Sequence, residues 1–361
     1  MKKLAVVFGG DSLEHDISII TGLFVAEELE KNNIDYIPLY LSRDNTFYTG
    51  DNLLNKNNYE NKKGFIKGTF VYKGGFYQFK YRHKYVDIEC AILCVHGANA
   101  EDGTLKAFFN LMKIPSTSSS VLNSAIIQDK HISKILMKNS GIPVVDSFRL
   151  NKNDRWELPD NFSFPLVIKP IHLGSSIGVK KVENNQEFLE HLNVAFNYDE
   201  SVIVEKAVEN LKELNIAILG NSDSFQLSEI ELVNVKNKVL SFSDKYELFQ
   251  SKYEGHVVPA KIPNIIEEQL KEYATKAFKL FDCQGVVRFD FLFDSKSKQV
   301  YLNEINSIPG SLAFYLFKNL DISFMDILNT MITVANEEYS KKRHLITTYE
   351  YSNLKKLANK K

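Results

Sequence analysis

The stretch LVIKPIHLGSSIGVKKV, residues 166–182, decides which fold class the sequence supports. Its apolar start predicts a buried strand that ends at Lys169-Pro170, and the loop Gly174-Ser175-Ser176-Ile177-Gly178 follows after three residues. Backbone N–H groups and two hydroxyls in such a loop can bind phosphate oxygens, and Lys169 adds a positive charge. A plain hairpin turn is the alternative, because Gly and Ser are common in turns.

The two commonest nucleotide-binding motifs do not fit this chain. The glycine loop lacks the Gly-Lys-Ser/Thr ending of a P-loop, and no Gly-x-Gly-x-x-Gly turn follows the first apolar run. The sequence therefore disfavours both of these nucleotide-binding folds.

A second stretch, GVVRFDFLFDSKSKQVYLNEINSIPG at residues 285–310, predicts two strands joined by a short polar turn. Strand alternation places polar side chains on one face of each strand. On the first strand these are Arg288 and Asp290, with Leu292, and on the second strand Glu304 and Asn306, with Leu302.

Two carboxylates and an amide oxygen on paired strands are the hard oxygen ligands that Mg²⁺ prefers. An Arg–carboxylate network on a solvated face is the alternative. Apolar neighbours such as Val287, Phe289 and Phe291 favour the metal site, because carboxylates inside a sheet are costly without a cation.

The N-terminal part predicts an open α/β unit. An apolar run at Leu4–Phe8 ends at Gly9-Gly10, a helical pattern follows, and further apolar runs occupy Ile37–Leu41 and Ile88–Val95. Between them, aromatic and polar residues alternate on both sides of Gly74-Gly75, which predicts a hairpin.

The rest of the chain predicts two further units. Residues 124–140 favour one helix closed at Gly141, and residues 143–208 predict a small unit of strand, loop, helix and strand. From about residue 215 to 336 alternating strands surround a long helix at Ile265–Phe281.

Length and composition limit the class of protein. A chain of 361 residues with 44% apolar and 25% charged side chains is an ordinary globular protein of two or three domains. Its 44 basic and 45 acidic side chains give a net charge of −1, which excludes recruitment of nucleic acid or an anionic membrane by a global field.

Cysteine content and the N-terminus predict the compartment. Three cysteines make no disulfide framework, and the apolar run before Gly9 is too short for a signal core or a membrane span. We therefore expect a cytoplasmic protein. The basic tail, residues 341–361, is expected to be a solvated end.

Eight motifs in order resemble those of the D-alanine–D-alanine ligase family of ATP-grasp enzymes, over nearly the whole chain up to about residue 310. They are VVFGGDSLEHDIS (residues 6–18), HGANAEDGTLKAFF (96–109), QDKHISK (128–134), KPIHLGSSIG (169–178), VEK (204–206), the pair Lys245-Tyr246, RFDF (288–291) and NEINSIPG (303–310).

The resemblance implies a mixed α/β, ATP-grasp fold. Its expected domains are an N-terminal open α/β substrate-binding domain at 1–125, a small lid-like central domain with the phosphate loop at 126–208, and a mixed α+β C-terminal domain with the metal site at 209–340.

The resemblance also implies a role for individual residues in nucleotide and metal binding. The implied nucleotide contacts are Lys130, Lys169, Ser175 and Ser176 on the phosphates, Glu205, Lys206 and Val208 at the adenine hinge, and Glu213 on the ribose. The implied ligands of two Mg²⁺ ions, with Mn²⁺ as a substitute, are Asp290, Glu304 and Asn306.

For catalysis and amino-acid binding the resemblance implies a further set. Glu14 would bind the ammonium group of the first substrate. Through Ser175 and Tyr246, Glu14 would also hold a loop that closes over the site and excludes water. Arg288 and the Gly310 N–H would stabilise the oxyanion. Further substrate contacts would be His96, Lys245, Ser311 and Tyr315.

Four positions depart from the family pattern. Ala100 replaces a glycine, and Lys106-Ala107 replaces Gln-Gly. Tyr315 occupies the position of a serine that holds the carboxylate of the second substrate, so the identity of that substrate stays open. Tyr246 favours an amine over D-lactate as the nucleophile.

The expected function is ATP-dependent joining of D-alanine to D-alanine through an acyl phosphate, for peptidoglycan precursors. The alternatives are a different second amino acid, such as D-serine or a specialised dipeptide partner, and a catalytically silent nucleotide-binding regulator. Relatives are commonly homodimers, so a homodimer is expected.

Overall fold

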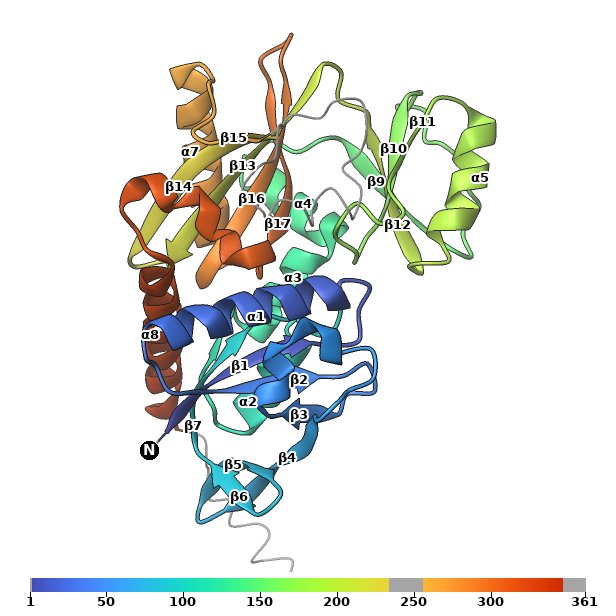
Figure 1. Ribbon diagram of the computed structural model, residues 1–361. Coiled ribbons are helices and arrows are strands. Elements are labelled where there is room, and N and C mark those ends of the chain that lie inside the picture. Colours follow the sequence, from blue (N-terminus) through green and yellow to red (C-terminus); the bar gives the residue numbers. More distant parts are fainter. Residues whose placement is uncertain (1, 234–255, 347–361) are drawn as a thin grey trace, which may run out of the picture.

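The computed structural model describes residues 2–233 and 256–346, and its strands form three sheets. In Figure 1 the first sheet lies at the bottom, the third lies above it, and the second projects to the upper right. This arrangement confirms the expected mixed α/β class.

The first sheet has eight strands in the order β6-β5-β4-β3-β2-β1-β7-β8. Its strands are β1 (Lys3–Gly9), β2 (Tyr36–Leu41), β3 (Phe47–Thr49), β4 (Ile66–Lys73), β5 (Phe76–Tyr81), β6 (Lys84–Val86), β7 (Ile88–Leu93) and β8 (Ser116–Thr117). The central strand β1 pairs in parallel with β2 and β7, and β4 and β5 form the predicted hairpin. The helices of this part are α1 (His15–Lys31), α2 (Thr104–Leu111) and the short 3-10 helices η1 (Asp51–Leu54) and η2 (Lys56–Asn58).

The turn from β1 to α1 requires glycine. Gly9 has a φ of 97°, and a Cβ there would lie 2.3 Å from the carbonyl oxygen of Leu41. Only a residue without a side chain fits this close approach in the left-handed region. The turn brings Glu14 to the N-terminal end of α1.

The single helix predicted over residues 124–140 is wrong. Two helices stand there, α3 (Val121–Gln128) and α4 (Lys130–Asn139), with Asp129 between them in an extended conformation. The Asp129 side chain accepts hydrogen bonds from the backbone N–H groups of His131 and Ile132, so it caps α4. The apolar period continues across this break, and therefore it did not reveal the cap.

The second sheet is antiparallel, in the order β11-β10-β12-β9. It consists of β9 (Ser147–Asn151), β10 (Leu166–Pro170), β11 (Lys180–Val182) and β12 (Ser201–Lys206), and α5 (Asn185–Ala195) covers one face. Phe188 and Leu192 of α5 pack on Leu166 and Ile168 of β10 in a small core. The predicted strand, loop, helix and strand are confirmed.

The third sheet has the order β15-β14-β13-β16-β17. It consists of β13 (Leu211–Gly220), β14 (Phe225–Val233), β15 (His256–Val257), β16 (Gly285–Asp294) and β17 (Val300–Asn306). Helix α7 (Asn264–Leu280) packs on one face, in a core that also includes Ile127 of α3 and Met137 of α4. The opposite face carries Arg288 and Asp290.

A bulge in β17 corrects the predicted alternation. Asp290 pairs with Glu304 but Phe291 pairs with Leu302, so Asn303 has no partner on β16. The extra residue turns Leu302 into the apolar core, whereas Glu304 and Asn306 stay on the polar face. The expectation that Leu302 shares the face of Glu304 is therefore wrong.

The chain then returns to the first sheet. After the 3-10 helices η3 (Gly310–Leu316) and η4 (Lys318–Leu320), α8 (Phe324–Arg343) packs Ile327 and Leu328 into the core of the first sheet. This helix links the two larger sheets, as Figure 1 shows.

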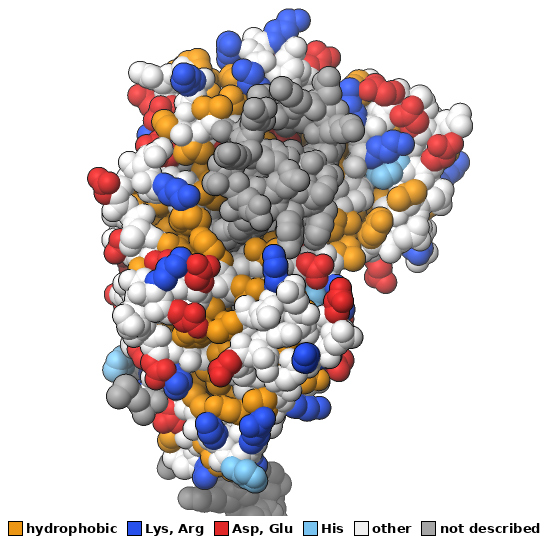
Figure 2. Space-filling model, viewed as in Figure 1, with side chains coloured by type: hydrophobic (Ala, Val, Ile, Leu, Met, Phe, Trp, Pro, Cys, Tyr) orange, Lys and Arg blue, Asp and Glu red, His pale blue; other side chains and the backbone are white. Residues whose placement is uncertain are grey.

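The surface agrees with the balanced composition. Figure 2 shows acidic and basic side chains interspersed over the visible face. Cys90, Cys94 and Cys283 are buried free thiols, as expected for a chain without a disulfide framework. None of the described helices is long and apolar enough to cross a membrane.

Candidate active site

The three sheets surround one large cavity, of about 1840 Å³. This exceeds the ~300–1,000 Å³ of typical small-molecule pockets, so the cavity can hold more than one substrate. Every predicted site residue that the structure describes lines it, namely Glu14, His96, Lys130, Lys169, Ser175, Ser176, Glu205, Lys206, Val208, Glu213, Arg288, Asp290, Glu304, Asn306, Gly310, Ser311 and Tyr315. Tyr246 and Lys245 lie outside the described residues.

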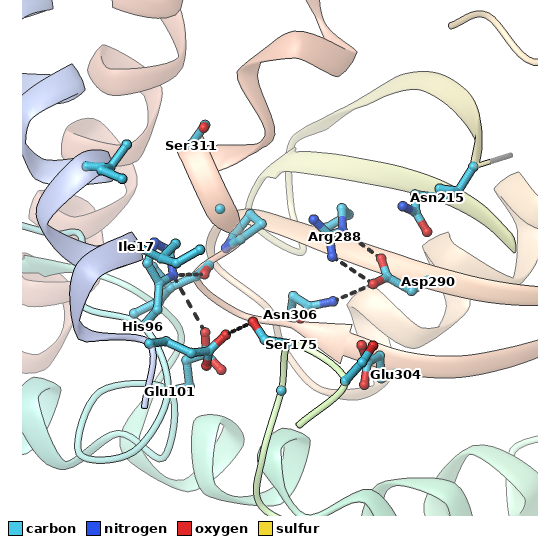
Figure 3. A pocket seen from close by; sticks show the side chains of 18 of the residues that line it. Ile17, His96, Glu101, Ser175, Asn215, Arg288, Asp290, Glu304, Asn306 and Ser311 are labelled. Carbon is cyan, nitrogen blue, oxygen red and sulfur yellow. Dashed lines mark hydrogen bonds and ion pairs between the residues drawn. The ribbon is translucent and has the colours of Figure 1, made fainter. Parts of the chain in front are cut away.

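Arg288 and Asp290 form a forked ion pair on β16 (Figure 3). The Arg288 Nε and Nη2 atoms lie 2.6 and 2.7 Å from the two Asp290 carboxylate oxygens, and Asn306 Nδ2 donates to Asp290 Oδ2 at 3.0 Å. Burial opposes the charge of Arg288, but the Asp290 carboxylate outweighs it and raises the Arg288 pKa. The fork uses two of the five guanidinium N–H groups, and others can bind an oxygen in the cavity.

Glu304 faces Asp290 across the strand pair and lies close to a lysine. The register sets Asp290 opposite Glu304, and Lys130 Nζ is 3.7 Å from Glu304 Oε2. Among the described residues, no three His, Cys, Asp or Glu side chains are grouped to hold a metal ion. A cation here would therefore take Asp290 and Glu304 together with the Asn306 amide oxygen and oxygens of a substrate.

A buried group of charges, the lysine cluster, lies beside this face: Lys130, Lys134, Lys169 and Glu205. The Glu205 carboxylate oxygens lie 2.9 Å from Lys134 Nζ and 2.7 Å from Lys169 Nζ. Burial alone would raise the pKa of Glu205, yet the two lysines lower it to about 2. Burial also lowers the pKa of Lys134. The cluster thus keeps ionised groups inside the protein by pairing them.

The sequence analysis did not predict two residues of this region, Lys134 and Asn303. Lys134 stands four residues after Lys130 on α4, and that spacing puts both lysines on one helix face, which is the signal that could have found it. Asn303 Oδ1 accepts a hydrogen bond from Lys169 Nζ at 2.8 Å, but only the bulge directs it there.

The glycine loop connects the second sheet with the first. Ser175 and Ser176 have φ values of 54° and 58°, in the left-handed region, and the Ser175 hydroxyl donates a hydrogen bond to the Glu14 carboxylate. Glu14 belongs to the turn after β1, so the loop reaches across the cavity between two domains.

His96 is a buried link between the first and third sheets. Its ring nitrogens lie 2.8 Å from Thr21 Oγ1 and 2.8 Å from the carbonyl oxygen of Ile308, and Nδ1 is 3.8 Å from Glu101 Oε1. These contacts hold the segment before Gly310 against α1. Around Gly310 no atom lies within 4 Å of a Cβ position, which leaves its backbone open to the cavity.

Near Arg288 the cavity is lined by Asn215, Glu231 and Tyr315, which we call the Tyr315 pocket; Ser311 lines the same cavity. The Tyr315 hydroxyl donates to Glu231 Oε2 at 3.1 Å, and Asn215 Nδ2 donates to the same oxygen at 2.9 Å. Burial, with the Glu231 charge, raises the pKa of Tyr315. Glu231 and Asn215 were missed, although a glutamate within an apolar strand such as IEL is a sequence signal for a buried polar contact.

Two family models match the chain. The model described as "D-ala D-ala ligase N-terminus" matches residues 3–119, and the one described as "D-ala D-ala ligase C-terminus" matches residues 136–333.

Full-length relatives agree with this match. The D-alanine–D-alanine ligase of Thermosipho melanesiensis is 34% identical over 95% of this chain and 96% of that protein, and the one of Thermosipho africanus is 33% identical over 96% of each.

Solved structures share the fold. The VanG D-Ala:D-Ser ligase of Enterococcus faecalis aligns with a TM-score of 0.77 at 27% identity, over 92% of this chain and 99% of that one. The D-alanine–D-alanine ligase of Helicobacter pylori aligns with a TM-score of 0.73 at 29% identity, over 92% and 98%.

Proposed function

The chain belongs to the D-alanine–D-alanine ligase family, and from this premise we propose that the cavity between its three sheets is the active site. The protein is an ATP-dependent ligase that joins two D-alanine molecules by a peptide bond. The dipeptide product serves peptidoglycan precursor synthesis. Its fold is the ATP-grasp fold of the family. The residue roles below are proposals.

The lysine cluster and the glycine loop would bind the ATP phosphates. Lys130 and Lys169 bring positive charge to the cavity, and the loop offers the Ser176 hydroxyl and the N–H groups of Ser175 and Ser176. Phosphoryl transfer depends on positioning and on charge neutralisation, and these residues supply both. The residues proposed for adenine and ribose, Glu205 to Val208 and Glu213, line the adjoining wall.

The polar face of β16 and β17 would bind Mg²⁺. Two carboxylates and an amide oxygen, from Asp290, Glu304 and Asn306, fit this ion by donor type, and Mn²⁺ prefers the same donors. When bound, the ion neutralises phosphate charge. Arg288 would keep the Asp290 carboxylate oriented through its forked bond.

The first D-alanine would lie between Glu14 and Arg288. Its ammonium group needs an anion, which Glu14 supplies, and its carboxylate oxygen attacks the γ-phosphorus of ATP while the bond to ADP breaks. The amine of the second D-alanine then attacks the acyl carbon, loses a proton, and phosphate leaves. Arg288 and the Gly310 N–H would stabilise the oxyanion, and His96 would hold the Gly310 segment in place.

The single observation that supports this assignment is the meeting of Glu14, Lys169 and Asp290 in one cavity, although 121 or more residues separate them pairwise in the chain. The assay is release of ADP with single and paired D- and L-amino acids. We expect release with D-alanine and none with L-alanine; release with an L-amino-acid pair alone would contradict the proposal. This activity also distinguishes the enzyme from a silent nucleotide-binding regulator.

The second substrate depends on the Tyr315 pocket. A phenol has one proton, and Tyr315 directs it to Glu231, so the same proton does not serve the carboxylate of an amino acid. We propose that Tyr315 acts by volume and restricts the second site to a small D-amino acid. D-serine is the competing candidate, because one structural neighbour carries that specificity in its name. Competition between D-alanine and D-serine, with the dipeptides separated by mass, decides between them.

We also propose that the enzyme is a cytoplasmic homodimer, in keeping with its cytosolic substrates and its family. Sedimentation equilibrium of the full chain is the direct measurement, and a monomer at assay concentrations would contradict this proposal.

A further inference from the structure

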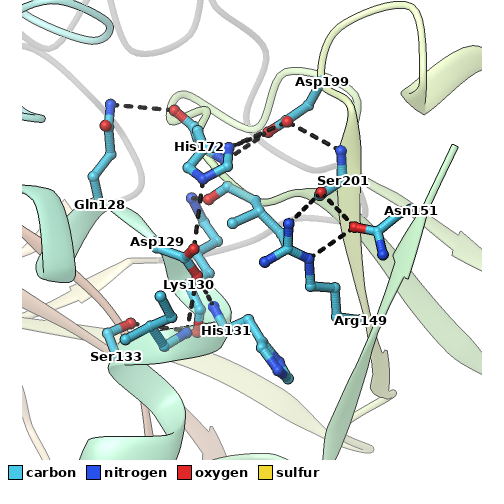
Figure 4. Close-up of polar contacts among 12 residues, drawn as sticks. Gln128, Asp129, Lys130, His131, Ser133, Arg149, Asn151, His172, Asp199 and Ser201 are labelled. Carbon is cyan, nitrogen blue, oxygen red and sulfur yellow. Dashed lines mark hydrogen bonds and ion pairs between the residues drawn. The ribbon is translucent and has the colours of Figure 1, made fainter.

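Residues 171–173, the loop root, are held by the junction of α3 and α4. They connect the end of β10 to the glycine loop, and each of their carbonyl oxygens receives a hydrogen bond from that junction (Figure 4). Lys130 Nζ donates to Leu173 at 2.6 Å and to Ile171 at 3.4 Å, and Gln128 Nε2 donates to His172 at 3.3 Å. The loop therefore begins at a fixed place on α4.

The His172 side chain adds a second attachment, between two carboxylates. Its Nδ1 lies 3.0 Å from Asp199 Oδ2, and its Nε2 lies 3.6 Å from Asp129 Oδ2. The His172 backbone N–H also donates to Asp199 Oδ2, at 2.8 Å. We call this arrangement the His172 bridge.

Each carboxylate of the bridge is itself fixed to a secondary-structure element. Asp129 caps the first turn of α4, and Asp199 Oδ1 accepts from the backbone N–H of Ser201, the first residue of β12. The bridge thus joins helix α4, the loop root and the second sheet at one point.

Both ring nitrogens face a carboxylate, so only the protonated imidazole can donate to both. The contacts with Asp129 and Asp199 raise the pKa of His172 to about 9, although burial opposes this. Other titratable or charged groups nearby include Lys130, which faces the loop root, His131 of α4, which interacts with Asp129, and Arg149 of β9, which bonds Ser201.

The glycine loop needs such a support. Ser175 and Ser176 both have left-handed backbone angles, which residues with a Cβ keep only where the surrounding structure determines them. The far end of the loop is held too, because His191 Nε2 lies 2.8 Å from the carbonyl oxygen of Gly178. Lys130, which holds the root, is also 3.7 Å from Glu304.

We propose that His172 is a positioning residue, whose imidazole ties Asp129 to Asp199 and so fixes Ser175, Ser176 and Lys130 where they contact the phosphates of ATP. The proposal rests on the proposed nucleotide site. His172 itself does not contact the nucleotide; it acts through the loop root and Lys130.

The main experiment replaces His172 with Gln, which removes the positive charge and puts one amide nitrogen in place of the two ring nitrogens that face Asp129 and Asp199. We expect the KM for ATP to rise about tenfold or more, since small displacements of positioning groups are costly, with little change in the KM for D-alanine at saturating ATP. His83→Gln is the matched control, because His83 is exposed in the β5–β6 turn. An unchanged KM for ATP in His172→Gln overturns the proposal.

Rescue by charge separates positioning from mere structure. His172→Arg restores a cation that can reach both carboxylates, so its KM for ATP should lie within about twofold of the wild type. As pH rises through about 9 the wild-type KM for ATP should increase, because the imidazole loses its proton, whereas His172→Arg should not follow this limb. The proposal is contradicted if the KM for ATP of His172→Arg is as high as that of His172→Gln. It is also contradicted if the KM of His172→Arg rises near pH 9 as it does in the wild type.

A variant of one of the two carboxylates tests the proposal even if His172→Gln unfolds below the assay temperature. Asp199→Asn should raise the KM for ATP in the same way, and the double variant should be no worse than the poorer single variant, since both break one bridge. If the increases in the KM for ATP multiply in the double variant, the proposed bridge is refuted. If the wild type itself releases no ADP with D-alanine, the proposed function fails, not the bridge.

Discussion

The lysine cluster and the Tyr315 pocket lie in one cavity and hold buried carboxylates by different means. Glu205 is paired directly with two lysine charges, at 2.9 and 2.7 Å, whereas Glu231 accepts hydrogen bonds from Tyr315 and Asn215 and also interacts with the charge of Arg288. Two direct lysine charges at the first place suit a polyanionic ligand, and the hydrogen-bonded carboxylate near Arg288 at the second suits a small amino acid. The comparison indicates that catalysis is most sensitive at the lysine cluster and selectivity at the Tyr315 pocket.

The largest effect is expected for Lys169→Met. It removes a cation from the phosphate site and leaves Glu205 with one partner, so kcat for ADP release should fall by about 10²–10³. A loss of less than tenfold in a folded variant would break the comparison, because the lysine cluster would then be structural only.

Lys134→Met tests the role of the lysine cluster in the stability of the protein. Lys134 is buried and faces Glu205, and removal of one partner of a buried pair costs about 3–5 kcal/mol of unfolding free energy. Urea unfolding measures it. If Lys134→Met is as stable as the wild type, the pair does not hold the cluster together.

The pH dependence of this pair has a definite sign. Two lysines lower the Glu205 pKa from 4.5 to about 2 despite burial, so its contribution is present above pH 4.5 and is lost as pH falls toward 2. Urea unfolding across this window should show a steeper loss for the wild type than for Lys134→Met, in which Glu205 has lost one of its two cations. Parallel curves would show that other carboxylates dominate.

Tyr315→Ser tests the other region. Removal of the phenol enlarges the second site, so kcat/KM for a larger second D-amino acid should rise about tenfold relative to D-alanine, with the KM for ATP unchanged. Tyr315→Phe is the control, since it removes the hydroxyl and keeps the volume. If Tyr315→Phe broadens selectivity equally, the hydroxyl rather than the volume decides.

The smallest effect is expected for Lys138→Met, a matched exposed lysine on the same helix as Lys134. Its Nζ lies 3.0 Å from Asp146 Oδ1, with the two side chains 66% and 48% exposed. Exposed ion pairs contribute little, so the change in unfolding free energy should stay within about 1 kcal/mol, and activity should not change. A loss comparable to that of Lys134→Met would remove the distinction between buried and exposed pairs.

The sequence by itself determined most strands and the glycine loop, because apolar periodicity and short motifs are local properties of the chain. The predicted site residues that the structure describes line one cavity, and their roles stay a prediction. The sequence determined the paired placement of Asp290 and Glu304 as well, since both lie on neighbouring strands with a short turn.

Only the tertiary structure decided where the apolar pattern is interrupted and which distant residues complete the site. Asp129 splits one apolar period into two helices, and the Asn303 bulge turns Leu302 into the core. Lys134, Glu231 and the His172 bridge acquire their contacts from residues distant in the chain. Such contacts depend on how sheets and helices pack, and side chains that meet through packing leave no fixed spacing in the sequence.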